Sequence, residues 1–125
     1  MKPHTEKVLR DLLAWDRQRI TVAVQKHARL FPDYTDRQDR AEMALSQPPG
    51  SWSMEVREYW QSLVEVHGDI AAGAPRVAQA LGIGLERIYK GPASVRDFGI
   101  LVSIADEIGV LPVLRGAGGK AWRSA

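Results

Sequence analysis

The stretch Val77–Lys90, VAQALGIGLERIYK, decides how this chain is interpreted. It begins with helix-forming residues, is interrupted by two glycines and continues as a second run with apolar periodicity. Gly82 is a natural left-handed helix cap, because glycine adopts positive φ without steric cost. The pattern predicts one short helix from Pro75 to Leu81. It predicts a second from about Gly84 to the Gly91-Pro92 pair, where proline stops it.

Two short helices joined by a tight glycine turn cross at a steep angle, which is the geometry of a helix-turn-helix. The crossing requires a small residue where one helix passes over the other, and Ala78 stands at that position. The apolar residues around the turn would then form a small shared core, made of Val77, Leu81, Ile83 and Ile88. The alternative is an αα-hairpin within a helical bundle that has no role in DNA binding.

The rest of the chain is also helical in pattern, so we predict an all-α protein. Further helices are expected over residues 5–31, over 36–46, from Ser51 or Ser53 to Ala72 at most, and over 94–108. The predicted caps are Thr35 with Gln38, and Ser94 with Asp97. Gly73 is expected to end the third helix. The Pro48-Pro49-Gly50 run suggests a boundary, which gives an N-terminal helical region (1–50), a helix-turn-helix domain (51–112) and a flexible basic tail (113–125).

Composition limits the possible functions. The chain has 125 residues, 45% of them hydrophobic, and no cysteine, so disulfides and thiolate metal sites are excluded. No apolar run is long enough to span a bilayer, and we expect a cytoplasmic protein. Residues 1–67 contain ten basic and ten acidic side chains, whereas residues 68–125 contain seven and five. The net charge of +2 therefore lies in the C-terminal half, as a weak electrostatic signal for a polyanion.

Residues 68–111 resemble the helix-turn-helix of the XRE/Cro/cI-like superfamily, and within it the HigA-like antidote proteins and the phage Cro/cII repressors. The residues that carry the resemblance are Val77, Ala78, Leu81, Gly82, Ile83, Ile88, Tyr89, Lys90 and the segment 95–110. The resemblance covers about a third of the chain. It implies a transcriptional regulator, often a homodimer, that represses by occupying operator DNA.

The resemblance also implies the DNA-contacting residues. Arg76 and Gln79 would lie on the first helix near the phosphate backbone. The second helix would present Leu85, Glu86, Arg87, Tyr89 and Lys90 to the major groove of double-stranded DNA. Two positions depart from the family pattern. Gly84 stands where serine or threonine usually caps the second helix, and Leu85 stands where a polar base reader is common.

Leu85 and the amphipathic first helix favour a second hypothesis, in which the chain is a protein-binding antitoxin or inhibitor. Its N-terminal region (1–50) would then grip a partner such as a toxin. The basic tail could lie along DNA, with Trp122 entering a minor groove, or remain a solvated end. We interpret His67, beside Asp69, as a cation at a helix end. No motif for a catalytic site, a cofactor or a metal is present, so we do not expect an enzyme.

Overall fold

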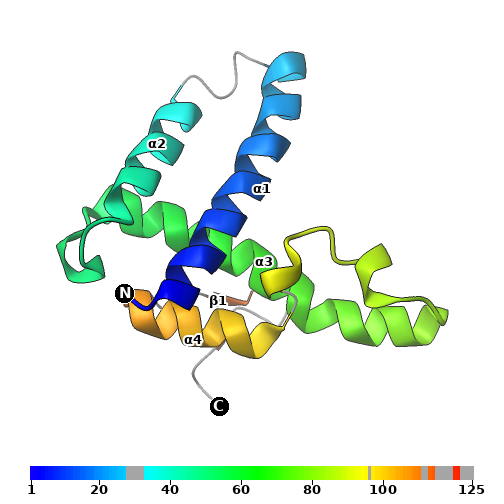
Figure 1. Ribbon diagram of the computed structural model, residues 1–125. Helices are drawn as coiled ribbons and strands as arrows, with labels where there is room; N and C mark the ends of the chain where they lie inside the picture. Colours follow the sequence, from blue (N-terminus) through cyan, green and yellow to red (C-terminus); the bar gives the residue numbers. More distant parts are fainter. Residues whose placement is uncertain (28–32, 96, 111–112, 115–119, 122–125) are drawn as a thin grey trace.

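The computed structural model describes residues 1–27, 33–95, 97–110, 113–114 and 120–121, with side chains described for 1–19, 33–95 and 97–110. The described residues form four α-helices (Figure 1), as the expected all-α class requires. Their bounds are α1 Pro3–His27, α2 Tyr34–Ala44, α3 Met54–Leu81 and α4 Phe98–Ile108. Single 3-10 turns lie at η2 Pro49–Ser51, η3 Leu85–Arg87 and η4 Ala93–Val95.

A two-residue antiparallel pairing completes the described elements. Strands β1 (Val113–Leu114) and β2 (Lys120–Ala121) pair with Val113 opposite Ala121. The remainder of the tail predicted over 113–125 lies outside the described residues, as does the predicted end of the first helix at residue 31.

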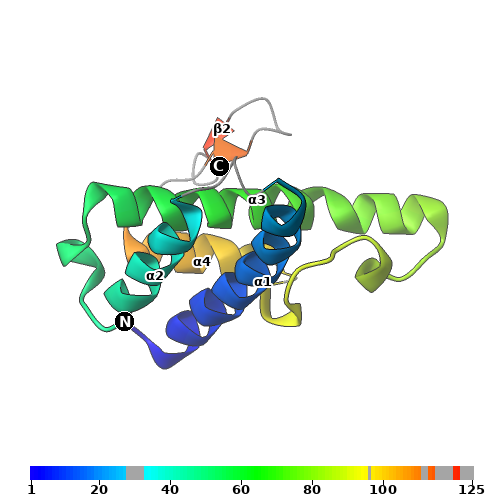
Figure 2. The same ribbon diagram turned by 90° about the horizontal axis from the view of Figure 1, so that it is seen from above.

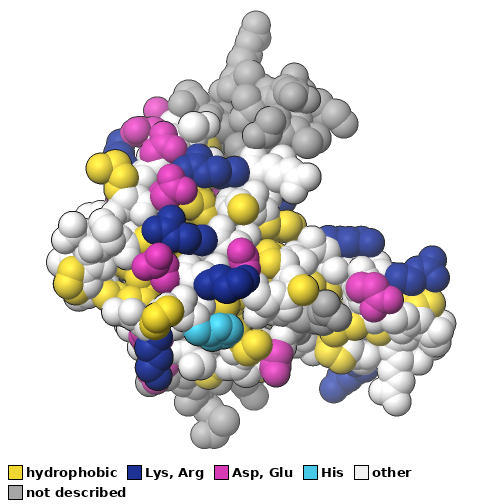
Figure 3. Space-filling view, in the orientation of Figure 1, with side chains coloured by type: hydrophobic (Ala, Val, Ile, Leu, Met, Phe, Trp, Pro, Cys, Tyr) yellow, Lys and Arg dark blue, Asp and Glu magenta, His cyan; other side chains and the backbone are white. Residues whose placement is uncertain are grey.

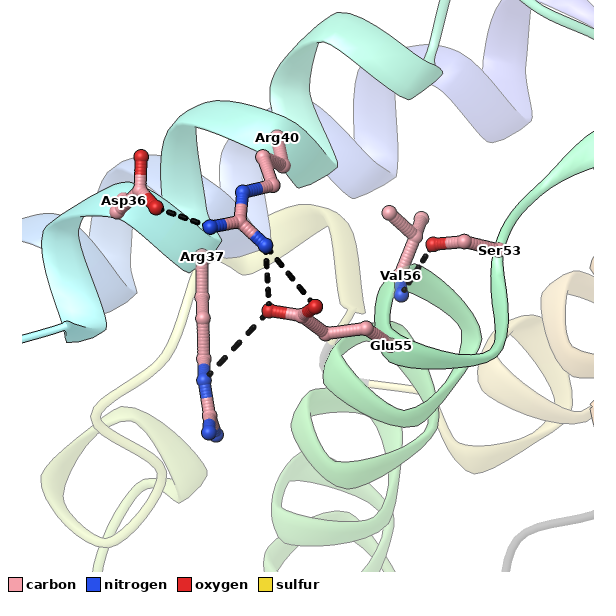
Figure 4. Close-up of polar contacts among 6 residues, drawn as sticks. All are labelled: Asp36, Arg37, Arg40, Ser53, Glu55 and Val56. Carbon is pink, nitrogen blue, oxygen red and sulfur yellow. Dashed lines mark hydrogen bonds and ion pairs between the residues drawn. The ribbon is translucent and has the colours of Figure 1, made fainter.

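Some of the predicted helix caps are present in the structure and others are not. Ser53 caps α3, and its hydroxyl accepts the backbone N–H of Val56 at 3.2 Å, as Figure 4 shows. Thr35 does not cap α2, which begins after Asp33 without a side-chain cap. Asp97 rather than Ser94 caps α4, by accepting the backbone N–H of Gly99 at 2.8 Å. Ser94 lies on the preceding 3-10 turn instead.

The helix α3 is the largest departure from expectation, because it runs unbroken through Gly73 and Pro75. Among the described residues only Gly82 and Gly109 have positive φ, so Gly73 does not adopt the conformation of a helix stop. Proline removes one backbone hydrogen bond, which is a local cost. Burial of Ala71, Ala74 and Ala78 on one face of α3 offsets this cost, since the face is continuous only if the helix is.

The turn after α3 is as predicted, but the helix after the turn is not. Gly82 has φ 67°, and the backbone N–H of Ile83 bonds to the carbonyl of Ala78 at 3.0 Å. The predicted helix over 84–91 is replaced by the single turn η3. Gly84 supplies no side-chain cap, and the pair Gly91-Pro92 follows too closely for a longer helix. A helix-turn-helix domain is therefore not confirmed.

The core lies between the first half of α3 and the helices α1, α2 and α4, which pack around it (Figures 1 and 2). Trp60 of α3 is fully buried at its centre. The α1 contribution consists of Val8, Leu9, Leu12 and Leu13, and the α4 contribution consists of Leu101, Ile104, Ala105 and Ile108. Residues from 1–50 and from 51–112 thus share one core, while the domain boundary between them stays a prediction.

A buried carboxylate joins three helices inside this core. Asp16 of α1 is fully buried, and its Oδ2 accepts from the Tyr34 hydroxyl at 2.9 Å, Gln38 Nε2 at 3.0 Å and the Tyr59 hydroxyl at 2.8 Å. Arg19 donates to Oδ1 at 2.8 Å. Burial raises the pKa of Tyr34 to about 12 and also raises that of Tyr59, so both phenols stay protonated donors. The network fixes α1 and α2 on α3.

An exposed ion-pair cluster adds a second connection between α2 and α3 (Figure 4). The Arg40 guanidinium binds both carboxylate oxygens of Glu55 at 2.9 Å and also pairs with Asp36. Arg37 lies 3.8 Å from the same Glu55. Exposed pairs of this kind contribute little stability, so the cluster serves mainly to align the two helices.

We expect Gly73→Ala to stabilise the protein by roughly 0.5–1 kcal/mol, because alanine favours a helix interior and a Cβ at Gly73 meets open space. The matched variant Gly82→Ala should destabilise it by about 1 kcal/mol, because Gly82 has positive φ. Urea unfolding monitored by circular dichroism measures both changes. A loss of stability in Gly73→Ala would contradict a continuous α3.

Asp16→Ala should lower the free energy of unfolding by about 3 kcal/mol or more, because it leaves the buried donors of Tyr34, Gln38 and Tyr59 without an acceptor. Asp39→Asn is the control, since it removes only an exposed pair with Arg17 and should cost less than about 1 kcal/mol. Equal losses in the two variants would show that the Asp16 network does not hold the helices together.

Candidate nucleic-acid interface

The end of α3 and the chain that follows it project from the body as a separate lobe. We define the projecting lobe as residues 70–93, which extend past α1, α2 and α4 and then return to α1 in Figures 1 and 2. This lobe contains three basic side chains and one acidic side chain, a net charge of +2. The whole chain has the same net charge, because the −3 of residues 1–69 and 94–112 and the +3 of residues 113–125 cancel. In Figure 3 dark blue side chains lie on the projection, and on the body they alternate with magenta acidic side chains.

All the predicted DNA-contacting residues lie in the lobe, but some are exposed and others are half-buried or buried. Arg76 and Gln79 are exposed on α3, Glu86 and Arg87 are exposed on η3, and Lys90 is exposed just after it. Leu85 is half-buried and packs against the core. Tyr89 is only 4% exposed, so its ring is part of the core in this conformation. A surface hollow of about 290 Å³ lies between Glu86, Tyr89, Lys90, Gly91 and Ala93.

Tyr89 is held by a buried histidine. Its hydroxyl lies 2.8 Å from His67 Nδ1, and the Trp15 ring packs edge-on against His67 with centroids 4.3 Å apart. A Cβ on Gly91 would lie 2.4 Å from the Tyr89 hydroxyl oxygen and 2.5 Å from His67 Cε1. Only glycine therefore fits at position 91 while the contact between Tyr89 and His67 is kept.

His67 is not the helix-end cation that the sequence suggests. It lies inside α3 and is fully buried, and burial lowers its pKa to about 4, so the imidazole is neutral near pH 7. Sequence reasoning missed this role because the partners Trp15 and Tyr89 lie 52 residues before and 22 residues after it. No local pattern signals such a contact.

Two further hydrogen bonds attach the end of the lobe, and the turn η4 that follows it, to α1. Trp15 Nε1 donates to the backbone carbonyl of Lys90 at 3.0 Å, and the Ser94 hydroxyl donates to Asp11 Oδ2 at 2.8 Å. Bonds from Lys7 and Ser94 hold the pKa of Asp11 below its usual value, so this acceptor stays ionised. The backbone from which the side chains of Arg87 and Lys90 extend is thus fixed relative to the body.

The lobe can therefore present positive charge to a large anionic surface. No group of three metal-binding side chains occurs among the described residues. Within that same part of the chain, each helix is too short or too polar to cross a membrane. The chemistry available at the lobe is charge pairing and hydrogen bonding by Arg76, Arg87 and Lys90.

Compared with known proteins, the chain matches no family model, no curated protein and no solved structure. The resemblance to the helix-turn-helix superfamily consequently stays an expectation drawn from residues 68–111.

We expect the stability contributed by neutral His67 to be present above pH 6.5 and to be lost as the pH falls toward 4. In this range the unfolded chain binds a proton that folded His67 does not, so protonation favours unfolding. The contribution amounts to about 3 kcal/mol, from roughly 1.4 kcal/mol per unit of pKa difference. Urea unfolding at a series of pH values measures it, as the difference between the parent and His67→Gln.

The exposed His4 provides the control, because His4→Gln should leave the pH profile of the parent unchanged. If His67→Gln and the parent lose stability in parallel between pH 6.5 and 4, His67 is not buried as a neutral group.

Proposed function

We propose that this protein is a non-enzymatic, cytoplasmic transcriptional regulator that binds double-stranded DNA through the projecting lobe. The observation that carries the proposal is the charge of the exposed lobe, which is +2, whereas residues 1–69 and 94–112 together have a net charge of −3. Positive side chains that neutralise phosphates provide most of the affinity for DNA. Repression would follow from occupancy of an operator, and a homodimer would bring two lobes to one site.

The roles of the lobe residues follow from their positions. Arg76 and Gln79 of α3 would contact the phosphate backbone, and Arg87 and Lys90 would contact phosphates or guanine edges. Glu86 is exposed beside Arg87 and could accept a hydrogen bond from cytosine. Tyr89 is left out of the contacting set, because its hydroxyl is engaged by His67.

The short η3 turn limits how the lobe would select a sequence. One turn presents far fewer side chains to a groove than a full helix does, so phosphate contacts should dominate the affinity. We therefore expect sequence preference at only a few base pairs, read chiefly by Glu86 and Arg87. Each correct bidentate contact discriminates against the wrong base by about 1–3 kcal/mol.

A second function, as an antitoxin or another protein-binding inhibitor, is favoured by exposed apolar residues. Val77 is 46% exposed and Leu81 is 64% exposed on the projecting end of α3. The predicted partner-binding arm is a weaker candidate surface, because Leu9, Leu12 and Leu13 of α1 are buried in the protein's own core. A toxin or other protein would accordingly dock on α3, and the two functions can coexist.

We expect the triple variant Arg76→Ala/Arg87→Ala/Lys90→Ala to bind duplex DNA roughly 10- to 100-fold more weakly than the parent at 0.1 M salt. The slope of log affinity against log salt should fall by about 2 to 3, since each lost phosphate contact removes about 0.9. Fluorescence anisotropy with duplexes selected from a random pool, repeated at two salt concentrations, measures both quantities.

The control Lys7→Ala/Arg10→Ala/Arg37→Ala removes the same charge from exposed positions of the body. It should retain most of the affinity and the salt slope of the parent. Equal weakening of the two variants would mean that total charge and not the lobe governs binding. If the parent binds no duplex even at low salt, the DNA proposal fails and the protein-binding function becomes the better one.

A further inference from the structure

An apolar seam runs along α3 at the spacing of a coiled coil. Its residues follow one another at alternating intervals of three and four, the a/d pattern of a heptad. In the first half of the helix, Val56, Tyr59 and Leu63 of this pattern are buried in the core. In the second half the pattern continues beyond the body as Val66, Ile70, Gly73, Val77 and Ala80, which we call the exposed seam.

The exposed seam has no cover comparable to the core. Val66 is 41% exposed and Val77 is 46% exposed, while Gly73 and Ala80 are also exposed and Ile70 is half-buried. A Cβ placed on Gly73 meets no atom within 4 Å. Small residues at Gly73 and Ala80 permit another helix to approach closely. In Figure 2 this end of α3 extends past α1, α2 and α4.

We propose that the exposed seam binds the same seam of a second copy of this chain, with the two α3 helices antiparallel and a two-fold axis near Gly73. The proposal gives a surface to the homodimer of the proposed function and rests on that part of it alone. It assigns Arg76 to the dimer instead of to a phosphate. The contacts that a dimer offers to DNA are then Gln79, Arg87 and Lys90. With the axis at Gly73, Val66 lies opposite Ala80 of the second copy, and Ile70 lies within about one residue of Val77 of the second copy.

Charge complementarity identifies the second copy as the occupant. Asp69 and Arg76 flank the seam on the same side, each one residue before an apolar seam position, and correspond to g positions of the heptad. Antiparallel helices bring g positions against g positions. Asp69 lies four residues before Gly73 and Arg76 lies three after it, so each Asp69 meets Arg76 of the second copy. Because the dimer has a two-fold axis, the pair between Asp69 and Arg76 occurs twice.

The two flanking residues also lack partners within one chain. Asp69 is half-buried and forms no ion pair among the described side chains, and because its Oδ1 is shielded from solvent only Oδ2 can reach a second copy. Arg76 is exposed and forms no ion pair in that part of the chain. A parallel pairing would instead place Asp69 and Arg76 against the e positions Ala74 and Leu81 of the second copy, and neither of these residues is charged. The antiparallel arrangement alone gives both charges a partner.

The dimer should be weak and dependent on concentration. The exposed seam spans 15 residues, or roughly 21 Å of helix, and contains only three large apolar side chains. We therefore expect a dissociation constant in the micromolar range. Sedimentation equilibrium of the protein alone, without DNA, can measure a constant of this size.

Sedimentation equilibrium over a concentration series tests the surface. Val77→Lys should weaken dimerisation at least tenfold, whereas Met43→Lys, at a 74% exposed methionine of α2, should not change it. Circular dichroism verifies that each variant is folded. A parent that stays monomeric at several hundred micromolar overturns the proposal, and so does a dimer that both lysine variants leave intact.

A charge swap tests the antiparallel register. Asp69→Arg alone places two arginines together and Arg76→Asp alone places two acids together, so each should weaken dimerisation about tenfold. The double variant Asp69→Arg/Arg76→Asp should restore it to within about threefold of the parent. Additive weakening in the double variant overturns the antiparallel pairing.

The absence of cysteine allows an independent check of the axis. Gly73→Cys should form a disulfide-linked dimer under mild oxidation, whereas Ser103→Cys, at an exposed position of α4, should not. Equal cross-linking of the two variants contradicts an axis near Gly73. Because these measurements contain no DNA, their failure leaves the anisotropy test of the lobe separately interpretable.

Discussion

The arrangement of this protein depends on one buried carboxylate. Asp16 accepts hydrogen bonds from Tyr34 and Gln38 of α2 and from Tyr59 of α3, inside a core that excludes water. A charged group in such a position is tolerated only when its hydrogen bonds are complete. The three helices must therefore meet in one geometry, which apolar packing alone would specify less strictly.

The position of the projecting lobe follows from that geometry. Trp15, the neighbour of Asp16 on α1, packs on His67 and donates to the backbone of Lys90. The Tyr89 hydroxyl contacts His67, and position 91 must be glycine because a Cβ there would collide with both side chains. The helix that carries the buried carboxylate thus also orients the basic residues of the lobe. A change in α1 should be transmitted to the proposed DNA-binding surface through these few contacts.

The sequence correctly predicted those structural features that depend on residues close together in the chain. The all-α class, the Ser53 cap and the left-handed Gly82 follow from periodicity and from the special backbone of glycine. Pro75 and Gly73 were misleading, because tertiary burial of Ala71, Ala74 and Ala78 outweighs local helix propensity. For the candidate site, the exposed charges of Arg76, Arg87 and Lys90 follow from polarity. The burial of Tyr89 against His67 depends on a contact between distant residues, which the sequence does not reveal.

The central claim is that the projecting lobe is the part of the protein that meets DNA. It is tested most directly by backbone amide NMR spectra of the isotope-labelled protein during titration with duplex DNA. We expect the largest shift changes at Arg76, Glu86, Arg87 and Lys90, and we expect added salt to reduce them. Shift changes confined to the α1, α2 and α4 surfaces, with the lobe signals unmoved, would contradict it.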